Sequence, residues 1–165
     1  MNNVPKDIAV ETNGSQECLN CLKALLQSST EPSLSENEIS RITGMVSKAF
    51  DSTGFIGLDV SDINALFDGA TSLYVGIGLG SGASRATDAA QEVLTQPQCG
   101  ANVCYAGGAL VLIDASEDVE LSEIEETVTL IQEKLPDNAN VLFSADLNAS
   151  MSDCIRISLI LINSK

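Results

Sequence analysis

Short apolar runs alternate with amphipathic segments from residue 71 onward, and this order constrains the fold more than any other feature of the sequence. Four runs have the length and composition of strands: 72–78, 108–115, 140–146 and 154–163. Two segments between them place apolar residues at helical spacings of three and four: 84–95 and 121–135. Helices that join strands predict right-handed crossovers and parallel pairing. The order β-α-β-α-β-β therefore predicts an α+β two-layer sandwich, in which a four-stranded mixed sheet carries both helices on one face.

The first part of the sequence predicts a helical extension ahead of this unit. The first dozen residues are polar, and we expect them to be loose. Residues 15–28 predict a helix that turns four side chains inward: Cys18, Cys21, Leu22 and Leu25. A proline and several serines predict a linker at 28–35, and residues 36–50 predict a second amphipathic helix. A short helix is expected before the first strand, with three apolar residues on one side: Ile63, Leu66 and Phe67.

The charge balance of the chain is strongly acidic. It has 23 Asp and Glu residues against 8 Lys and Arg, a net charge of −15 at pH 7, and only Arg85 and Lys134 are basic between positions 49 and 155. Such a surface repels phosphate backbones and anionic lipid headgroups, which predicts no binding to nucleic acid and no basic attachment to membranes. The acidic run at 116–126 predicts either a solvated helix start, favoured by the helix dipole, or a docking surface for a basic partner.

Hydropathy and cysteine content indicate the cellular compartment. No apolar run approaches the roughly 20 residues that span a bilayer, and the start is polar, so we expect a cytoplasmic protein without direct membrane insertion. The 5 cysteines are then expected to be reduced. Cys18 and Cys21 have redox or zinc spacing, and Cys99 with Cys104 could complete four sulfur ligands. The second pair lacks tight spacing and the chain has no His, so packing is the favoured interpretation and no metal site is predicted.

A row of alternating glycines joins the first predicted strand to its helix, in VGIGLGSGASRATDAAQEVL (75–94). This layout suits a phosphate loop, in which backbone N–H groups and a helix N-terminus bind an anion. However, no Lys-Ser or Lys-Thr follows as in a P-loop, and no acidic residue stands about 20 positions on as in a dinucleotide site. The favoured interpretation is steric, because glycines in a strand let the following helix approach closely.

The segments around the glycine row resemble the C-terminal domain of FtsZ, a family related to tubulin. GLDVSDI (57–63) is similar to the NxDxxD loop of that family, SRATDAAQEVL (84–94) to its RAxxAA helix, and DNANVLFSADLNASM (137–151) to its DNAxV segment. The resemblance covers about residues 55–163. It implies three parts: 1–35, a polar and helical extension; 36–54, a helix similar to the end of the family's central helix; and 55–165, the FtsZ-like C-terminal domain.

The resemblance also implies a catalytic site. In the family, the acidic loop of one subunit enters the nucleotide pocket of the next subunit and completes GTP hydrolysis there. Asp59 and Asp62 fall on the two acidic positions, which implies a role in trans in which a carboxylate orients a water or binds a cation. Gly57 replaces the Asn of the motif. Alternatively, Asp59 or Ser61 caps the short helix and Asp62 lies in its first turn; both interpretations stay open.

Three functions are compatible with the sequence. Residues 1–35 cannot hold the family's GTP-binding domain, so we expect the chain alone to bind no cofactor, to meet GTP only through a partner subunit, and not to polymerise by itself. The first function is a cell-division or cytoskeletal module that docks on the nucleotide face of an FtsZ-type GTPase and modulates polymerisation or hydrolysis. The second is a small oligomeric enzyme of chorismate-mutase-like topology, which would need arginine clusters, whereas the arginines are Arg41, Arg85 and Arg156. The third is a degenerate FtsZ fragment.

Overall fold

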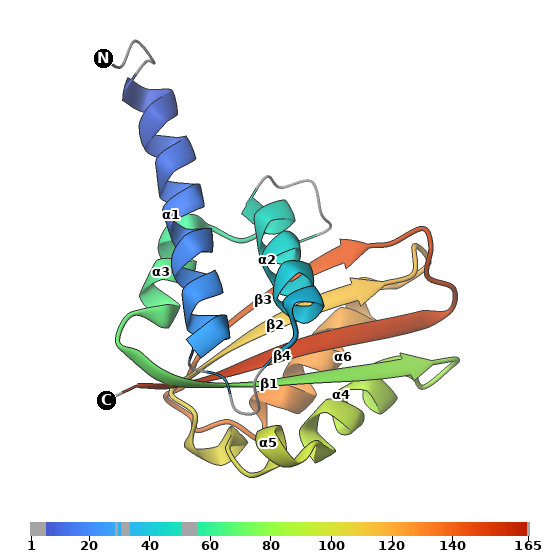
Figure 1. Ribbon diagram of the computed structural model, residues 1–165. Coiled ribbons are helices and arrows are strands. Elements are labelled where there is room, and N and C mark those ends of the chain that lie inside the picture. The colour runs from blue at the N-terminus through green and yellow to red at the C-terminus, as the bar shows by residue number, and fades with distance from the viewer. Residues whose placement is uncertain (1–5, 29, 31–33, 51–55, 165) are drawn as a thin grey trace.

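One sheet with helices on both faces makes up the part of the chain that the computed structural model describes, residues 6–28, 30, 34–50 and 56–164, with side chains described from residue 14 to residue 163 of these ranges (Figure 1). The elements in chain order are α1 (Lys6–Ser28), α2 (Glu36–Phe50), α3 (Val60–Phe67), β1 (Ala70–Ser81), α4 (Arg85–Thr95), α5 (Pro97–Gly100), the 3₁₀ helix η1 (Val103–Tyr105), β2 (Gly108–Ala115), α6 (Leu121–Gln132), β3 (Asn140–Leu147) and β4 (Cys154–Ser164). This order confirms the predicted succession of strands and helices.

The four strands form a mixed sheet in the order β1-β4-β2-β3. β4 lies antiparallel to both β1 and β2, whereas β2 and β3 are parallel neighbours. The predicted α+β fold with a four-stranded mixed sheet is therefore confirmed. β4 lies between β1 and β2, so the connection from β1 to β2 crosses it. β2 and β4 are the two central strands, and most of their residues are buried, as expected for strands that are covered on both faces.

The glycine row places α4 directly on β1. A Cβ atom added at Gly78 would meet the carbonyl oxygen of Ala89 and lie 2.8 Å from the amide nitrogen of Val93. A Cβ atom at Gly80 would meet the carbonyl oxygen of Arg85 in the same way. The facing side of α4 carries small buried residues: Ala86, Ala89, Ala90 and Val93. This contact supports the steric interpretation of the glycines, since the backbone of α4 occupies the space that side chains would need.

α1, α2 and α3 cover the opposite face of the sheet from α4 and α6 (Figure 1). Their buried residues form one core with the even-numbered residues of the central strands, among them Leu22, Ile42, Ile63, Leu110 and Ile160. The N-terminal helices thus add a layer above the predicted two-layer sandwich. Two details of the prediction were wrong, because α1 begins at Lys6 within the stretch expected to be loose, and the side chain of Cys21 is exposed rather than turned inward.

Two glutamine side chains and one backbone bridge occupy the middle of the outer edge of β1. The backbone N–H of Ile77 donates to Oε1 of Gln96 over 2.9 Å, and Nε2 of Gln96 donates to the carbonyl oxygen of Ile77. Nε2 of Gln98 donates to the carbonyl oxygen of Val75 over 2.9 Å, and Thr30 forms an isolated parallel bridge with Leu73. The two glutamines lie just after the end of α4. Because α4 packs closely against the glycines of β1, it brings both side chains to the outer edge of that strand.

Candidate functional site

The candidate site is the acidic turn, residues 57–62, which contains both predicted site residues. Asp59 occupies the N-cap position of α3 with an extended backbone (φ −101°, ψ 138°). Its carbonyl oxygen accepts hydrogen bonds from the backbone N–H groups of Asp62 (3.1 Å) and Ile63 (3.2 Å). The position is thus that of a cap, but the side chain of Asp59 makes no capping hydrogen bond.

The two carboxylates of the acidic turn lie at the surface. Asp59 and Asp62 are exposed, and neither side chain makes a hydrogen bond or ion pair with any residue that the structure describes. Asp62 lies in the first turn of α3, where the helix dipole favours a negative charge. Both residues therefore occupy the positions that the capping interpretation predicts. Their side chains are nevertheless exposed and make no capping hydrogen bond with the described residues.

The backbone holds the acidic turn from both sides. Ile56, which precedes it, exchanges two backbone hydrogen bonds with Ala145 of β3, at 2.9 and 3.2 Å. The N–H of Leu58 donates to the carbonyl oxygen of Ala49 at the end of α2, over 3.1 Å. After the turn, Ile63 and Leu66 are buried and fix α3 to the core. Gly57, at the position of the family's Asn, is exposed and brings no side chain to the site.

Two carboxylates on a fixed, exposed turn can accept hydrogen bonds, orient a water molecule or contribute ligands to a cation. Within the described residues, no three Cys, Asp or Glu side chains come together in a way that could hold a metal ion. Among the described residues, the acidic turn thus offers these two carboxylates without a third ligand beside them.

Arg85 organises a second group of charges, which the sequence analysis did not identify. It is 5% exposed at the start of α4, and its guanidinium donates to both carboxylate oxygens of Glu123, over 2.7 and 2.9 Å. Further hydrogen bonds reach Ser116 (3.0 Å), Asp118 (3.2 Å) and Asp153 (3.4 Å). Arg85 thus ties together the three connections at one end of the sheet: β1 to α4, β2 to α6, and β3 to β4.

The electrostatics of this cluster are those of a structural ion network. The hydrogen bond from Arg85 is the main reason that the pKa of Glu123 lies below its ordinary value. The hydrogen bond from Ser116, and then that from Arg85, lower the pKa of Asp118. The bond to Glu123 in turn raises the pKa of Arg85. One feature of the sequence could have predicted this network, namely the rarity of basic residues. If the single arginine of an acidic segment becomes buried, its charge must be paired with carboxylates.

Arg41 and Arg156 lie on the other face of the sheet, beneath α2. Nη1 of Arg41 donates to Oγ of Ser158 over 2.8 Å, and Arg156 pairs with Asp114 on the neighbouring strand. Burial, and then the charge of Arg156, lower the pKa of Arg41. The sheet separates these two arginines from Arg85. The described residues therefore provide no cluster of all three, which an enzyme acting on anionic substrates would need.

The five cysteines differ in exposure, and Cys154 is intermediate between the buried and the exposed ones. Burial raises the pKa of Cys18 to about 11 and that of Cys99 to about 12, which makes these thiols unreactive at neutral pH. Cys21 and Cys104 are exposed.

None of the helices in the described ranges combines the length and the apolar composition that a membrane crossing needs.

Comparison with known proteins places this geometry in a family. The family model described as FtsZ family, C-terminal domain, matches residues 71–164, more than half of the chain. The chain belongs to the FtsZ family. The predicted resemblance is therefore confirmed for the sheet and the two helices α4 and α6, and the acidic turn lies just ahead of the matched residues.

One FtsZ sequence is similar to this chain, and three solved structures share its fold. The cell division protein FtsZ of Methanothermobacter thermautotrophicus is 28% identical over 119 residues, which cover 72% of this chain and 30% of that protein. Two FtsZ structures from M. jannaschii superpose with a TM-score of 0.66 at 21% identity, covering 86% of this chain and 44% and 43% of those chains. TubZ of Bacillus thuringiensis serovar israelensis shares the fold, with a TM-score of 0.53 at 10% identity over 78% of this chain and 35% of that one. The chain thus spans less than half the length of these relatives.

Proposed function

We propose that this FtsZ-family chain is an interaction module in cell division, which docks its acidic turn on the nucleotide face of an FtsZ-type GTPase and modulates polymerisation or GTP hydrolysis in trans. The observation that carries the proposal is that the side chain of Asp59 is exposed and does not cap its helix. Asp59 occupies the N-cap of α3 without a capping hydrogen bond, and like Asp62 it is exposed and bonds to none of the residues that the structure describes. If capping were their whole role, the side chain of Asp59 would be expected to accept a backbone N–H of the first turn.

The chemistry of a nucleotide pocket suits two such carboxylates. Hydrolysis of a terminal phosphate depends on positioning of the attacking water and on charge stabilisation, and a carboxylate serves both needs by orienting the water or by binding a cation. The turn itself lacks further ligands among the described residues, so the partner supplies the nucleotide and its metal ion. In this proposal the chain meets GTP only in the complex.

The assembly of proteins with this fold supports an effect on filaments. One neighbour of this fold, TubZ, is described as forming protofilaments in its GDP form, and one M. jannaschii FtsZ structure is described as a dimer. A heterologous contact propagates only when each subunit offers two complementary faces. A chain that engages a filament through the acidic turn alone adds to one end and stops further growth there.

The test measures the GTPase rate and the sedimentable polymer of the full-length FtsZ from the same organism, titrated with this protein. The Asp59→Asn, Asp62→Asn double variant removes both charges at nearly constant side-chain volume. The Glu125→Gln, Asp137→Asn double variant is the matched control, since it removes two exposed charges elsewhere on the surface. We expect the wild-type chain and the control to shift either quantity at substoichiometric ratio, and the acidic-turn variant to have no effect.

Two results would contradict the proposal. If neither the rate nor the polymer responds to the wild-type chain, it does not act on the filament, and a degenerate domain becomes the better account. If the acidic-turn variant acts as strongly as the wild-type chain, the contact uses another surface. Binding should also depend on the nucleotide state of the partner, which sedimentation with GTP-loaded and GDP-loaded FtsZ measures directly.

A further inference from the structure

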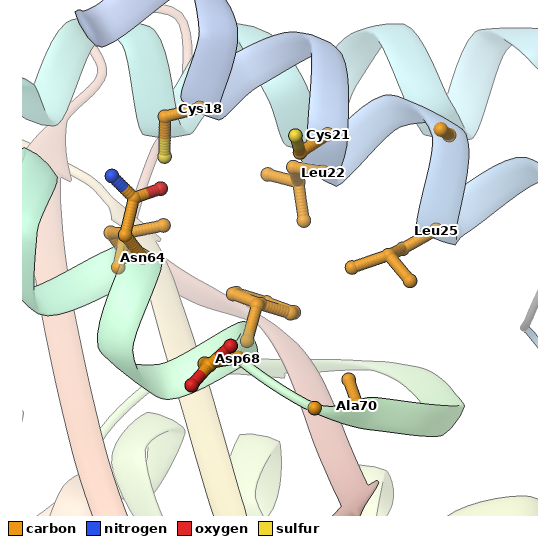
Figure 2. Close-up of a pocket in the computed structure, with 11 residues that line it drawn as sticks. Cys18, Cys21, Leu22, Leu25, Asn64, Asp68 and Ala70 are labelled. Carbon is orange, nitrogen blue, oxygen red and sulfur yellow. The ribbon is translucent and has the colours of Figure 1, made fainter.

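A cavity of about 580 Å³ lies between α1, the C-terminal half of α3 and the start of β1 (Figure 2). Sites for small molecules typically measure roughly 300–1,000 Å³, so this cavity is large enough for an organic ligand. Gly69 is one of the residues that line it, with φ +74°, and no atom lies within 4 Å of the position where a Cβ atom would stand. The cavity is separate from Asp59 and Asp62, which lie at the other end of α3.

The walls of the cavity are mainly apolar. Leu22 and Leu25 come from α1, Ile63 and Phe67 from α3, and Ala70 from β1. Leu22 and Ile63 belong to the buried core, whereas Leu25 and Phe67 remain partly exposed at the cavity. An apolar group placed between these two side chains would remove their surface, and its own, from water.

The cavity has few polar side chains, and one of them, Asp68, is negatively charged. Asn64 and Asp68 are four residues apart, so they lie on one side of α3 (Figure 2). Both are exposed, and neither side chain makes a hydrogen bond or ion pair within the described part of the chain. Asp68 is the C-cap of α3, whose last turn contains no basic residue, so the negative end of the helix dipole adds to its charge. No lining residue is basic.

We propose that this cavity binds a small molecule with an apolar body and a protonated amine at one end. The body lies between Leu25 and Phe67, and the ammonium group lies at the carboxylate of Asp68 and the terminal carbonyl groups of α3. A carboxylate or phosphate ligand of the same shape is disfavoured by Asp68 and by the net charge of −15. This inference does not depend on the proposed function, because it uses neither Asp59 nor Asp62.

The cysteines provide an internal readout for occupancy. Cys21 lines the cavity and is exposed, so a bound ligand should shield its thiol. Cys104 is also exposed but lies on η1 outside the cavity, so its alkylation should not change. Cys18 lines the cavity too, but it is buried and should remain unmodified. The ratio of Cys21 to Cys104 alkylation, measured by peptide mass spectrometry after a short exposure to iodoacetamide, therefore reports binding.

The experiment titrates the full chain with 4-phenylbutylamine and with two probes of the same skeleton, 4-phenylbutanol and 4-phenylbutanoate. We expect the amine to protect Cys21 with a midpoint about fivefold below that of the alcohol, which is the upper end for one partly exposed ion pair. The carboxylate should be weakest. In Asp68→Asn the amine and the alcohol should become equal, whereas the surface control Asp137→Asn should keep the preference. Both changed residues are exposed, so circular dichroism should show folded variants.

Three outcomes would overturn the inference. Failure of every probe to protect Cys21 would show that the cavity takes no such ligand. Equal protection by the amine and the alcohol in the wild-type chain would show an apolar cavity without selection for a cation. An amine preference that survives in Asp68→Asn would place the cation away from that carboxylate.

Discussion

Substitution of Gly78 by alanine tests whether α4 lies in backbone contact with β1. The added methyl group would meet the carbonyl oxygen of Ala89 and lie 2.8 Å from the amide nitrogen of Val93. Neither atom can rotate away, because both belong to the backbone of α4. The helix must therefore shift, and its buried residues lose packing against the sheet. Overpacking of a core costs roughly 1–3 kcal/mol, and we expect about 3 kcal/mol less free energy of unfolding because the opposing atoms are backbone.

Gly44→Ala is the matched control, since it adds the same methyl group where no atom lies within 4 Å, on an exposed position of α2. Alanine is favoured over glycine in a helix by about 1 kcal/mol, so this variant should be more stable than the wild-type chain. The two variants should differ by about 4 kcal/mol in urea unfolding followed by circular dichroism. A Gly78→Ala protein as stable as the wild-type chain would refute the close contact.

The ion network and the cysteines give three more predictions. Arg85→Met should lower the free energy of unfolding by about 3 kcal/mol in urea titrations, because the largely buried carboxylate of Glu123 loses its counter-ion; an unchanged midpoint would contradict this. Since the pKa of Glu123 is held below its ordinary 4.5, its stabilisation is complete above that pH and is lost as pH falls through the folded value, so the wild-type midpoint should drop more steeply below pH 4.5 than that of Arg85→Met. Iodoacetamide should label Cys21 and Cys104 in the native protein and reach Cys18 and Cys99 only after unfolding, which rapid labelling of Cys99 would contradict.

The fold could be predicted from hydropathy because each buried face repeats at the period of its element. The alanine face of α4 and the apolar residues of α6 are buried as the spacing predicts, and β2 spans the predicted residues 108–115. The strand order was less accessible, since a sequence shows which segments are strands but not which one is inserted between two others. Cys21 was wrongly placed because a spacing of three from Cys18 fits the same face only approximately.

The position of the candidate site could be predicted from the sequence, but the conformation of its side chains could not. The motif spacing identified Asp59 and Asp62, and the structure shows them exposed on a turn that is held by Ile56 and Leu58. Capping could not be settled from residue types, because it depends on the orientation of one side chain. The partners of Arg85 were also beyond prediction. They come from connections that are 31 to 68 residues away along the chain, and only the folded sheet brings them together.

The glutamines at the edge of β1 restrict how a partner can recognise this edge of the sheet. Many complexes form when an extended peptide joins a sheet as an additional strand, and the main chain then supplies the affinity with little regard to sequence. On β1 the amide of Gln96 already occupies the place of such a strand at Ile77, and Gln98 does so at Val75. An incoming strand would have to displace these hydrogen bonds, each worth about 1 kcal/mol. Recognition at this side of the molecule therefore has to read side chains, which makes it selective and sensitive to single substitutions.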